Sequence, residues 1–406
     1  MFIFKAGKSH NNIRVSTMEE VFILNAGRVP AVKQDVDDVA RLAARAIAPL
    51  MDAAVFAREE VTALYVGNML SGILSHQQLL APLIAQHAKL TGCEAITAEA
   101  ACGSGAAAMR QGVMAIASGF HHLVVVAGAE QMSRNSRDEV SRGLATASCW
   151  EREGGKGETF ITLNARIMKA YMDTYATERS AFSHFAVNAH ENASKNHCAM
   201  LQKTITADDY DAGRMLADPI GLFDAPPICD GASALLLGNK DMALRAQRLG
   251  MPVVKVLAST CATDALAIED RQDPLALAAA RDSFKKAYKI SGVTPADIDV
   301  FEPHDAYTVM TALSLEAAGF SKPGTATHMA AEGMFTKTGS LPITSFGGLK
   351  ARGHPVGATG VYQLAECFLQ LTEQAGELQI PGATLAMTQN LGGAAGSAFT
   401  HILERI

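Results

Sequence analysis

Two periods of apolar and polar positions follow one another along the chain and predict strands that alternate with helices. Apolar residues recur at positions 36, 39, 43, 47 and 50, which predicts a helix from about Asp35 with one face toward a core. Residues 123–127 form an unbroken apolar run, which is typical of a strand buried on both faces in a parallel sheet. In the first half we expect strands at 21–25, 63–66, 96–100 and 123–127, and helices from about 35, at 77–91 and ending near 118.

The second half repeats this order, with strands expected at 253–257, 298–301, 385–387 and 398–403 and helices at 275–288 and 361–371. Residue identity between the halves is weak, so the repeat is one of architecture, and two fused βαβ lobes with a shared core fit it. We place the lobes at 18–250 and 251–406, behind a leader at 1–17. Residues 132–225 are polar and mixed, which predicts a large loop insertion that shapes a substrate site.

Composition supports a large buried α/β core. Of the 406 residues, 49% are hydrophobic and 19% are charged, which argues against disorder. The net charge of −6 is mild, and no Lys/Arg block with interleaved aromatics gives support to nucleic-acid binding. No apolar stretch approaches the roughly 20 residues that cross a bilayer. The sequence therefore predicts a protein that neither spans a membrane nor binds nucleic acid.

The leader and the cysteines bear on the compartment. Residues 1–17 carry three basic and no acidic residues, so organelle import is one interpretation, but a start-site artefact ahead of Met18 is favoured. The leader lacks the apolar core of a secretory signal. Seven scattered cysteines without CxxC spacing argue against a disulfide framework or a zinc site. We predict a cytoplasmic protein.

Cys102 is the first candidate for chemistry. It lies between an expected strand and the first turn of a helix, where unpaired N–H groups and partial positive charge favour thiolate over thiol. Its small neighbours Gly103 and Gly105 let a bulky acyl group approach. The other interpretation is a buried structural cysteine, which is the usual role of an isolated Cys.

Two histidines and a glycine turn complete the candidate set. His304 follows the strand expected at 298–301, where α/β enzymes place their sites, and His354 lies in the Gly-rich segment 347–360 ahead of a helix. A lone histidine is more often a hydrogen-bonded core or surface residue, but these settings favour catalysis. Gly392 lies in segment 390–393 (NLGG), whose N–H groups can donate to a developing oxyanion or which is a turn that needs glycine.

Four segments, in family order, resemble motifs of the thiolase family. Residues 99–105 (EAACGSG) resemble its nucleophile loop, and residues 127–133 (AGAEQMS) resemble its AGxExMS segment. Residues 230–232 (DGA) and 353–355 (GHP) resemble two further motifs. Each motif alone is weak, but together they are specific and extend from about Glu20 to the C-terminus. The resemblance implies a thiolase-type α/β fold, with two lobes in α-β-α-β-α layers.

Two departures point to one branch of the family. Residues 304–307 are HDAY where most thiolases carry NEAF, and residues 390–392 are NLG where they carry CxG. Both changes resemble the sterol-carrier-protein branch and its bacterial and archaeal relatives. Members of that branch with HDCF are thought to use that Cys in place of the missing one, but this chain has Ala306. Neither second cysteine is present, which leaves the usual proton transfer unexplained.

The resemblance implies a mechanism. Cys102, deprotonated with help from His354, would attack an acyl-CoA thioester, and the N–H groups of Cys102 and Gly392 would hold the oxyanion. His304 would bind the thioester oxygen of the second substrate. The acyl group would pass to CoA in thiolytic cleavage or to a carbon nucleophile in condensation. Coenzyme A thioesters would be substrates, with no tightly bound cofactor and no metal; which residues bind CoA is not indicated.

The resemblance also implies partners, and two alternative functions stay open. We expect a homodimer or homotetramer with the first-lobe sheet at the interface, and a small OB-fold partner protein that helps to hold CoA. A decarboxylating ketoacyl-synthase-like enzyme would use a similar Cys-His-His set and needs no α-proton abstraction. A subunit that only binds acyl-CoA or a partner protein is the non-enzymatic alternative, suggested by the missing cysteine.

Overall fold

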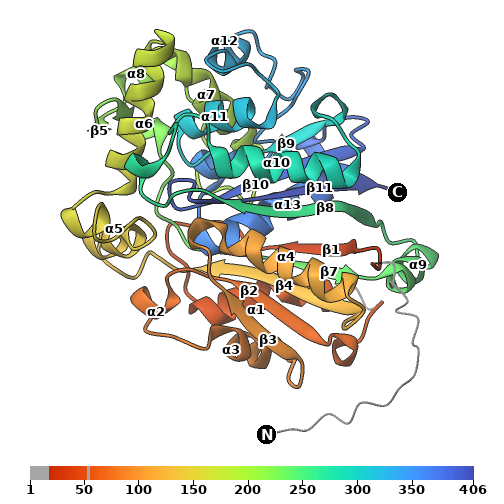
Figure 1. Ribbon diagram of the computed structural model, residues 1–406. Coiled ribbons are helices and arrows are strands. Elements are labelled where there is room, and N and C mark those ends of the chain that lie inside the picture. Colours follow the sequence, from red (N-terminus) through yellow and green to blue (C-terminus); the bar gives the residue numbers. More distant parts are fainter. Residues whose placement is uncertain (1–17, 53–54) are drawn as a thin grey trace, which may run out of the picture.

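The computed structural model describes residues 18–52 and 55–406, so the leader predicted at 1–17 lies outside the described residues. A nine-stranded sheet runs through the molecule (Figure 1). In order across the sheet, its strands are β3 (Glu94–Ala98), β2 (Ala63–Gly67), β4 (Leu123–Glu130), β7 (Gly231–Gly238), β1 (Phe22–Arg28), β8 (Val254–Thr263), β11 (Ser397–Arg405), β10 (Leu385–Gly392) and β9 (Val300–Glu302).

The sheet has two halves that meet at a short junction. In the first half β2 pairs in parallel with β3 and β4, and β7 pairs antiparallel with β4 and β1. In the second half β10 pairs in parallel with β9 and antiparallel with β11, which pairs antiparallel with β8. The halves are joined by two residue pairs of β1 and β8, Phe22 with Lys255 and Ile23 with Val254.

Helices cover both halves and fill the space between them. α1 (Val39–Asp52) and α3 (Leu80–His87) pack on the outer face of the first half, and α10 (Ala278–Ser291) and α11 (Thr308–Ala318) on that of the second. α4 (Ser104–Ala117) and α13 (Thr359–Leu371) share one hydrophobic cluster with strands of both halves. This confirms the α-β-α-β-α layering (Figure 1).

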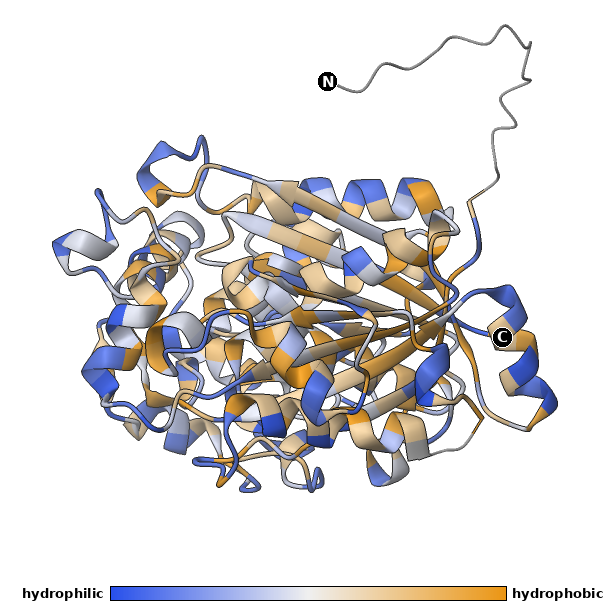
Figure 2. Cartoon of the chain, turned by 90° about the horizontal axis from the view of Figure 1, so that it is seen from below, coloured by the Kyte–Doolittle hydropathy of each residue, from blue (hydrophilic) through white to orange (hydrophobic). Residues whose placement is uncertain are grey.

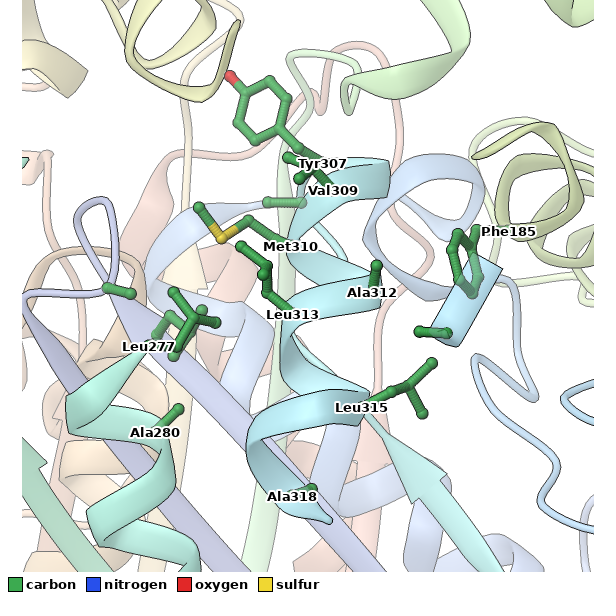
Figure 3. Packing of buried hydrophobic residues seen from close by; sticks show 14 of the residues in the cluster. Phe185, Leu277, Ala280, Tyr307, Val309, Met310, Ala312, Leu313, Leu315 and Ala318 are labelled. Atoms are coloured by element: carbon green, nitrogen blue, oxygen red, sulfur yellow. The ribbon is translucent and has the colours of Figure 1, made fainter. Parts of the chain in front are cut away.

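The burial pattern follows from these layers. Twelve of the thirteen residues of α13 are buried, as expected of a helix enclosed on all sides. The outer helices instead present one apolar stripe, and Figure 2 shows their hydrophilic positions outside the hydrophobic strands. On α11, Leu313, Leu315 and Ala318 lie between α10 and Phe185 of α7 (Ser183–Ala193) (Figure 3). None of the described helices is long and apolar enough to cross a membrane.

The segment 132–225, expected to be a loop insertion, contains four α-helices. They are α5 (Arg137–Ala145), α6 (Phe160–Tyr175), α7 and α8 (Ala207–Ala212), followed by the small strands β5 (Met215–Ala217) and β6 (Ile220–Gly221). Ser136, Thr159 and Thr206 cap α5, α6 and α8 by accepting from backbone N–H groups. The polar residues that suggested a loop include these caps, and one face of α6 joins the core.

Other expectations need correction. The helix expected from about Asp35 begins at Val39, because the Asp38 carboxylate accepts from the N–H groups of Ala40 and Arg41. Val36 is 91% exposed and does not belong to the apolar stripe. Some elements of the structure were not predicted from the sequence, among them β7, α9 (Lys240–Arg248), α11, α2 (Ser71–Leu74) and α12 (Ala326–Ala331).

The two central helices approach each other so closely that glycine is required. A Cβ at Gly105 of α4 would lie 2.9 Å from the Gly357 carbonyl oxygen and 3.0 Å from the Val361 nitrogen. A Cβ at Gly360 of α13 would lie 2.5 Å from the Ala106 nitrogen. These obstacles are backbone atoms, which cannot move aside as a flexible side chain does. The starts of α4 and α13 are thereby held together.

We expect Gly105→Ala to lower the free energy of unfolding by about 1–3 kcal/mol, because the added methyl group forces the helices apart. Urea unfolding monitored by circular dichroism measures the loss. Gly143→Ala in α5 is the matched control, because its Cβ would make only ordinary contacts of 3.4–3.6 Å with side chains. A Gly105→Ala variant as stable as the wild type would contradict the close-approach argument.

Candidate active site

Cys102 lies in a one-turn 3-10 helix (Ala101–Gly103) that leads directly into α4. Ala101 has a φ of 53°, a left-handed conformation that is unusual for alanine. The turn is fixed by Glu99 Oε1, which accepts from the Ala101 nitrogen at 2.6 Å, and by Ser104 Oγ, which accepts from the Ala100 nitrogen at 2.9 Å. Neighbouring side chains thus hold the candidate nucleophile in a strained turn.

His304 follows β9 and is held by the end of β10. Its backbone nitrogen donates to Gln389 Oε1 at 3.1 Å, and its Nδ1 lies 2.9 Å from Asn390 Nδ2. An amide nitrogen can only donate, so Nδ1 of His304 accepts and the ring proton is on Nε2. His304 therefore presents an N–H donor on its other side.

His354 has the opposite tautomer. It follows a π-helical turn (Gly348–Arg352), and its Nδ1 lies 2.7 Å from Thr359 Oγ1. The Thr359 hydroxyl donates its one proton to the Pro355 carbonyl oxygen at 3.1 Å, so it accepts from Nδ1–H of His354. Nε2 of His354 therefore has a free lone pair.

The structure brings these side chains together. The Cys102 sulfur and one ring nitrogen each of His304 and His354 lie within 4.8 Å of one another. The centroids of the two imidazole rings are 5.1 Å apart, and the ring planes are nearly perpendicular. All three residues line one cavity of about 550 Å³. Gly392 lies against the nucleophile turn, since a Cβ on it would be 2.5 Å from the Ala100 carbonyl oxygen. The roles assigned to the four residues stay predictions.

Burial sets the protonation of the site. Burial, and secondarily the Glu130 carboxylate, raises the pKa of Cys102 to about 12. The expectation that the helix start favours the thiolate is thus wrong, because desolvation of the buried thiol outweighs the effect of the helix start. Burial lowers the pKa of His304 to about 4 and also lowers that of His354, with a contribution from His304. Near neutral pH the site holds a thiol and two uncharged imidazoles.

Glu130, at the end of β4, was not singled out from the sequence. Its carboxylate accepts from the backbone nitrogens of Met69 (3.0 Å), Leu70 (3.2 Å) and Gly357 (3.1 Å) and from Asn68 Nδ2 (2.9 Å). Burial raises its pKa to about 7. It connects the first half of the sheet to the loop that follows His354. The AGAEQMS motif contained it, but gave no sign of this role.

Asp230 connects two of the sequence motifs. Its carboxylate accepts from the backbone nitrogens of Met132 (2.8 Å) and Ser133 (2.9 Å) and from Ser133 Oγ (2.5 Å). It also accepts from the Asp35 nitrogen at 2.9 Å. Because Met132 and Ser133 line the cavity, Asp230 fixes part of its wall.

A buried ion pair connects the two loops that carry the histidines. Lys350 Nζ lies 2.7 Å from Asp305 Oδ2, and both side chains are almost fully inaccessible. Asp305 Oδ1 also accepts from the Leu349 nitrogen at 2.7 Å. Breaking a buried pair by removing one partner commonly costs about 3–5 kcal/mol. The sequence hint of this buried ion pair was Lys350, a charged residue in segment 347–360, where most residues are apolar or small.

Comparisons with known proteins agree with this geometry. Residues 21–241 match the family model described as thiolase, N-terminal domain, and residues 260–405 match thiolase C-terminal domain-like. The chain belongs to the thiolase family. The Gly-His-Pro motif and the AGAEQMS segment are therefore thiolase motifs, which favours a thiolase over the ketoacyl-synthase alternative.

Curated relatives of this thiolase are acyltransferases and sterol carrier proteins. An acetyl-CoA acetyltransferase of Methanothermobacter thermautotrophicus is 40% identical over 85% of this chain and 89% of its own length. An acetyl-CoA acetyltransferase of Methanocaldococcus jannaschii is 33% identical over 87% of this chain and 91% of its own length. Sterol carrier protein 2 of Gallus gallus is 28% identical over 75% of this chain and 57% of its own length. The protein is thus an enzyme, an acyltransferase of the thiolase type.

Two solved structures share the fold. The Ltp2-ChsH2(DUF35) aldolase aligns with a TM-score of 0.80 at 20% identity, covering 96% of this chain and 98% of the other. Acat5 thiolase from Ascaris suum in complex with coenzyme A aligns with a TM-score of 0.71 at 18% identity, covering 96% of this chain and 100% of the other. At such identities the likeness concerns the fold.

The cavity of this thiolase has a basic rim and an apolar wall. Lys33, Arg137 and Arg214 line it, are exposed, and form no ion pair within the described part of the chain. Apolar side chains from the 132–225 segment and from α11 make up much of the remaining wall, among them Met132, Leu144, Phe160, Ile161, Leu216 and Met310. The segment 132–225 therefore contributes to the wall of the cavity.

A thiol and two imidazoles also form a donor set that zinc accepts. Cys102, His304 and His354 are close enough for one ion. The hydrogen bond from Asn390 argues against it, because it leaves Nε2 of His304 protonated and Nδ1 occupied. The arrangement suits proton transfer and hydrogen-bond donation better than metal binding.

Alkylation of Cys102 by iodoacetamide should reach its half-maximal rate well above the ordinary thiol pKa of about 8.5, because the buried thiol has a pKa of about 12. The rate is measured across pH by mass spectrometry of the Cys102 peptide. The same peptide in urea-unfolded protein is the control and should titrate near 8.5. A folded-state midpoint at or below that of the control would contradict the assigned protonation.

Proposed function

We propose that this thiolase forms an acyl-Cys102 intermediate and uses it in thiolytic cleavage of 3-ketoacyl-CoA, in condensation of acyl-CoAs, or in both. The proposal rests on the close approach of an uncharged Cys102 thiol and two histidines that have opposite tautomers. One histidine offers a free lone pair and the other an N–H donor. The lone pair can accept a proton, and the N–H donor can stabilise a developing oxyanion.

When an acyl-CoA is the donor, as in condensation or CoA exchange, Nε2 of His354 takes the thiol proton as Cys102 Sγ attacks the thioester carbon. The N–H groups of Cys102 and Gly392 hold the tetrahedral oxyanion. The bond to the CoA sulfur then breaks, and the departing thiolate takes the proton from His354. The balance is one acyl-cysteine and one CoA thiol, with His354 neutral again.

In condensation, His304 donates Nε2–H to the thioester oxygen of the second acyl-CoA. A base removes its α-proton, the enolate attacks the acyl-cysteine carbon, and the departing Cys102 thiolate takes up a proton. In cleavage, Cys102 gives its proton to His354 and attacks the 3-keto carbon of 3-ketoacyl-CoA; the C2–C3 bond breaks, His304 stabilises the acetyl-CoA enolate, and the enolate takes the proton from His354. His354 then deprotonates the CoA thiol, the thiolate attacks the acyl-cysteine, and the departing Cys102 thiolate takes that proton. Thiols are far more acidic than an α-carbon, so the absence of a second cysteine matters more for condensation.

CoA would enter along the basic rim. Lys33, Arg137 and Arg214, which form no ion pair with any described residue, offer positive charge to its phosphates. The apolar wall suits the remainder of the ligand. The CoA complex of the Ascaris suum structure supports this use of the fold. CoA acts here as a substrate, without a tightly bound cofactor.

A homodimer or homotetramer would form through the first half of the sheet. β3 is an edge strand of the nine-stranded sheet, and Ile96 on it and Met114 on neighbouring α4 are exposed. A second copy that covers this edge would satisfy its unpaired backbone groups. Light scattering at micromolar concentration should show at least a dimer; a monomer would refute this assembly.

A small OB-fold partner and a cytoplasmic location complete the proposal. The neighbour named Ltp2-ChsH2(DUF35) aldolase is compatible with a second protein on this fold. Full activity of the purified chain without any co-purifying protein would refute the partner. The seven cysteines are free, which fits a reducing compartment. Recovery in an organelle fraction would refute the cytoplasmic location.

Incubation with acetyl-CoA should add one acetyl group to the Cys102 peptide, as detected by mass spectrometry. Cys102→Ala should abolish both this adduct and CoA exchange while the protein stays folded, because a buried cysteine packs like a small hydrophobe. Wild-type protein without the adduct would favour the non-catalytic subunit. Substantial turnover by Cys102→Ala would refute the acyl-cysteine mechanism.

Thr359→Val should lower kcat for exchange of CoA into acetyl-CoA by about tenfold or more, because His354 loses the acceptor that keeps its Nε2 basic. The KM for acetyl-CoA should change little. Thr372→Val is the matched control, since the Thr372 hydroxyl also donates to a carbonyl oxygen four residues back, at the far end of α13. Equal kcat in both variants would remove Thr359 from the mechanism.

Ala306→Cys should raise the exchange of α-protons of acetyl-CoA, because it restores a thiol at the position that the sterol-carrier-protein branch uses. Deuterium washout from labelled acetyl-CoA measures this exchange. Wild-type protein should also favour thiolysis over condensation by more than the equilibrium requires. If the wild type already exchanges as fast as the variant, a histidine is a sufficient base and the missing cysteine has no consequence.

A further inference from the structure

Glu130 is a fully buried carboxyl group at the end of β4, and donors occupy both of its oxygens. Oε1 accepts from Asn68 Nδ2 at 2.9 Å and from the Leu70 nitrogen at 3.2 Å. Oε2 accepts from the Met69 nitrogen at 3.0 Å and from the Gly357 nitrogen at 3.1 Å. An ionised carboxylate offers about four acceptor sites, so these four donors match its charged form.

The Gly357 nitrogen connects Glu130 to the base. Gly357 lies three residues after His354 and two before Thr359, whose hydroxyl accepts from Nδ1–H of His354. The Gly357 peptide is tightly enclosed, because a Cβ on it would lie 2.6 Å from the Asn68 Cα and 2.9 Å from Glu130 Oε2. A shift of this peptide would displace both His354 and the group that fixes its tautomer.

The same carboxylate acts on the nucleophile through space. Cys102, Leu70 and Val356 belong to one hydrophobic cluster. Glu130 accepts from the Leu70 nitrogen and from the nitrogen of Gly357, the residue after Val356, so its charge lies against this cluster. Burial is the largest cause of the raised pKa of Cys102, and Glu130 is the next. Two like charges repel strongly in such a low-dielectric region, so the carboxylate opposes a thiolate.

The charge of Glu130 is balanced between two opposing effects. Burial raises its pKa to about 7, while the hydrogen bonds from its four donors oppose that rise. The titratable groups on the segments around it are Cys102 and Glu99 of the nucleophile turn, Asp230 ahead of β7 and His354 ahead of Gly357. A proton on Glu130 would take one acceptor site from a donor and remove the negative charge from the site.

We propose that Glu130 is a positioning residue of acyl transfer, which holds the His354 segment through the Gly357 nitrogen and opposes negative charge on Cys102 Sγ. Cys102 then loses its proton only to His354 Nε2, as the bond from sulfur to the substrate carbon forms. The inference rests on the proposed acyl-Cys102 intermediate and changes none of its bond-making steps. It adds one residue on which both the base and the nucleophile depend.

The first measurement is the pH profile of kcat for exchange of labelled CoA into acetyl-CoA by the full-length wild-type enzyme. With a pKa of about 7 for Glu130, kcat should fall about tenfold from about pH 8 to about pH 6, with little change in KM. Burial lowers the pKa of His304 to about 4 and lowers that of His354, so both stay uncharged in this range. A constant kcat would overturn the proposal, even if no variant folds.

Glu130→Gln removes the charge and keeps the reach of the side chain, but its NH2 group would face two of the four donors. Its kcat should be at least about tenfold lower at pH 8 and should not fall further toward pH 6. Alkylation of Cys102 by iodoacetamide at about pH 9 should become about tenfold faster, the change in thiolate fraction for one unit of its pKa. Wild-type kcat and alkylation rate in this variant would overturn the proposal.

Glu302→Gln is the matched control. Glu302 is a buried carboxyl group at the end of β9, where it accepts from the Ser345 nitrogen at 2.7 Å, and burial raises its pKa to about 8. This variant should keep the wild-type pH profile and alkylation rate. If the fall in kcat toward pH 6 disappears in Glu302→Gln instead, the titrating group is Glu302 and the proposal is overturned.

Glu130→Asp separates the charge from the positioning. It keeps a carboxylate but is one methylene shorter, so it cannot reach all four donors. Its kcat should fall about as far as that of Glu130→Gln, while its alkylation rate should stay within about twofold of the wild type. Equal acceleration of alkylation in both variants would indicate loosened packing and overturn the electrostatic role.

Failure of this inference differs from failure of the proposed function. Absence of a Cys102 adduct from acetyl-CoA in the wild-type enzyme would refute the proposed function, and this inference would fall with it. A Cys102 adduct together with a kcat that does not depend on Glu130 would refute the inference alone.

Discussion

The close approach of α4 and α13 is the constraint on which the rest of the site depends. Cys102 immediately precedes α4 and His354 lies just ahead of α13, so the two meet only if the helix starts touch. Gly105 and Gly360 make this possible, since a Cβ on either would overlap backbone atoms of the other segment. A Cβ at Gly360 would also lie 2.6 Å from Asn390 Oδ1, which brings the residue that holds His304 into the same contact. The segments that carry Cys102, His354 and Asn390 are thereby held together, the first two by packing of backbone on backbone.

Buried ion pairs then orient the loops that carry His304 and His354. The Asp305–Lys350 pair joins the loop of His304 to the turn before His354, and Arg352 pairs with Glu366 at 2.9 Å inside the same region. Such pairs contribute little net stability, because desolvation offsets their attraction, but breaking one leaves an unpaired charge. The same low-dielectric surroundings raise the pKa of Cys102 and lower those of the histidines. The burial that fixes the geometry of Cys102, His304 and His354 therefore also keeps these three side chains uncharged.

Elements and site residues that are marked by hydrophobic periodicity or by a motif could be predicted from the sequence. Features that depend on tertiary contacts could not. Most strands followed from apolar runs, and Cys102, His304 and His354 were candidates because of their places at strand and helix ends. The layers and the roles of these three residues came from the resemblance to thiolases. α6 was missed because half of its surface is polar, and β7 because its short GASALLLG segment looks like neither period. The thiol pKa was misjudged because burial is invisible in a sequence.

The change from a cysteine to Asn390 alters how protons are handled. A thiol at this position could give or take a proton, whereas an amide can only hold its partner, and here it holds His304 as an Nε2–H donor. Among the residues that line the cavity, His354 then offers the free ring lone pair that a base needs. In the mechanism proposed above, the proton that His354 takes from Cys102 leaves with the first product, so its Nε2 is free again for the second half-reaction. There a CoA thiol is far more acidic than an α-carbon, so a single histidine base suits attack by CoA better than formation of an enolate.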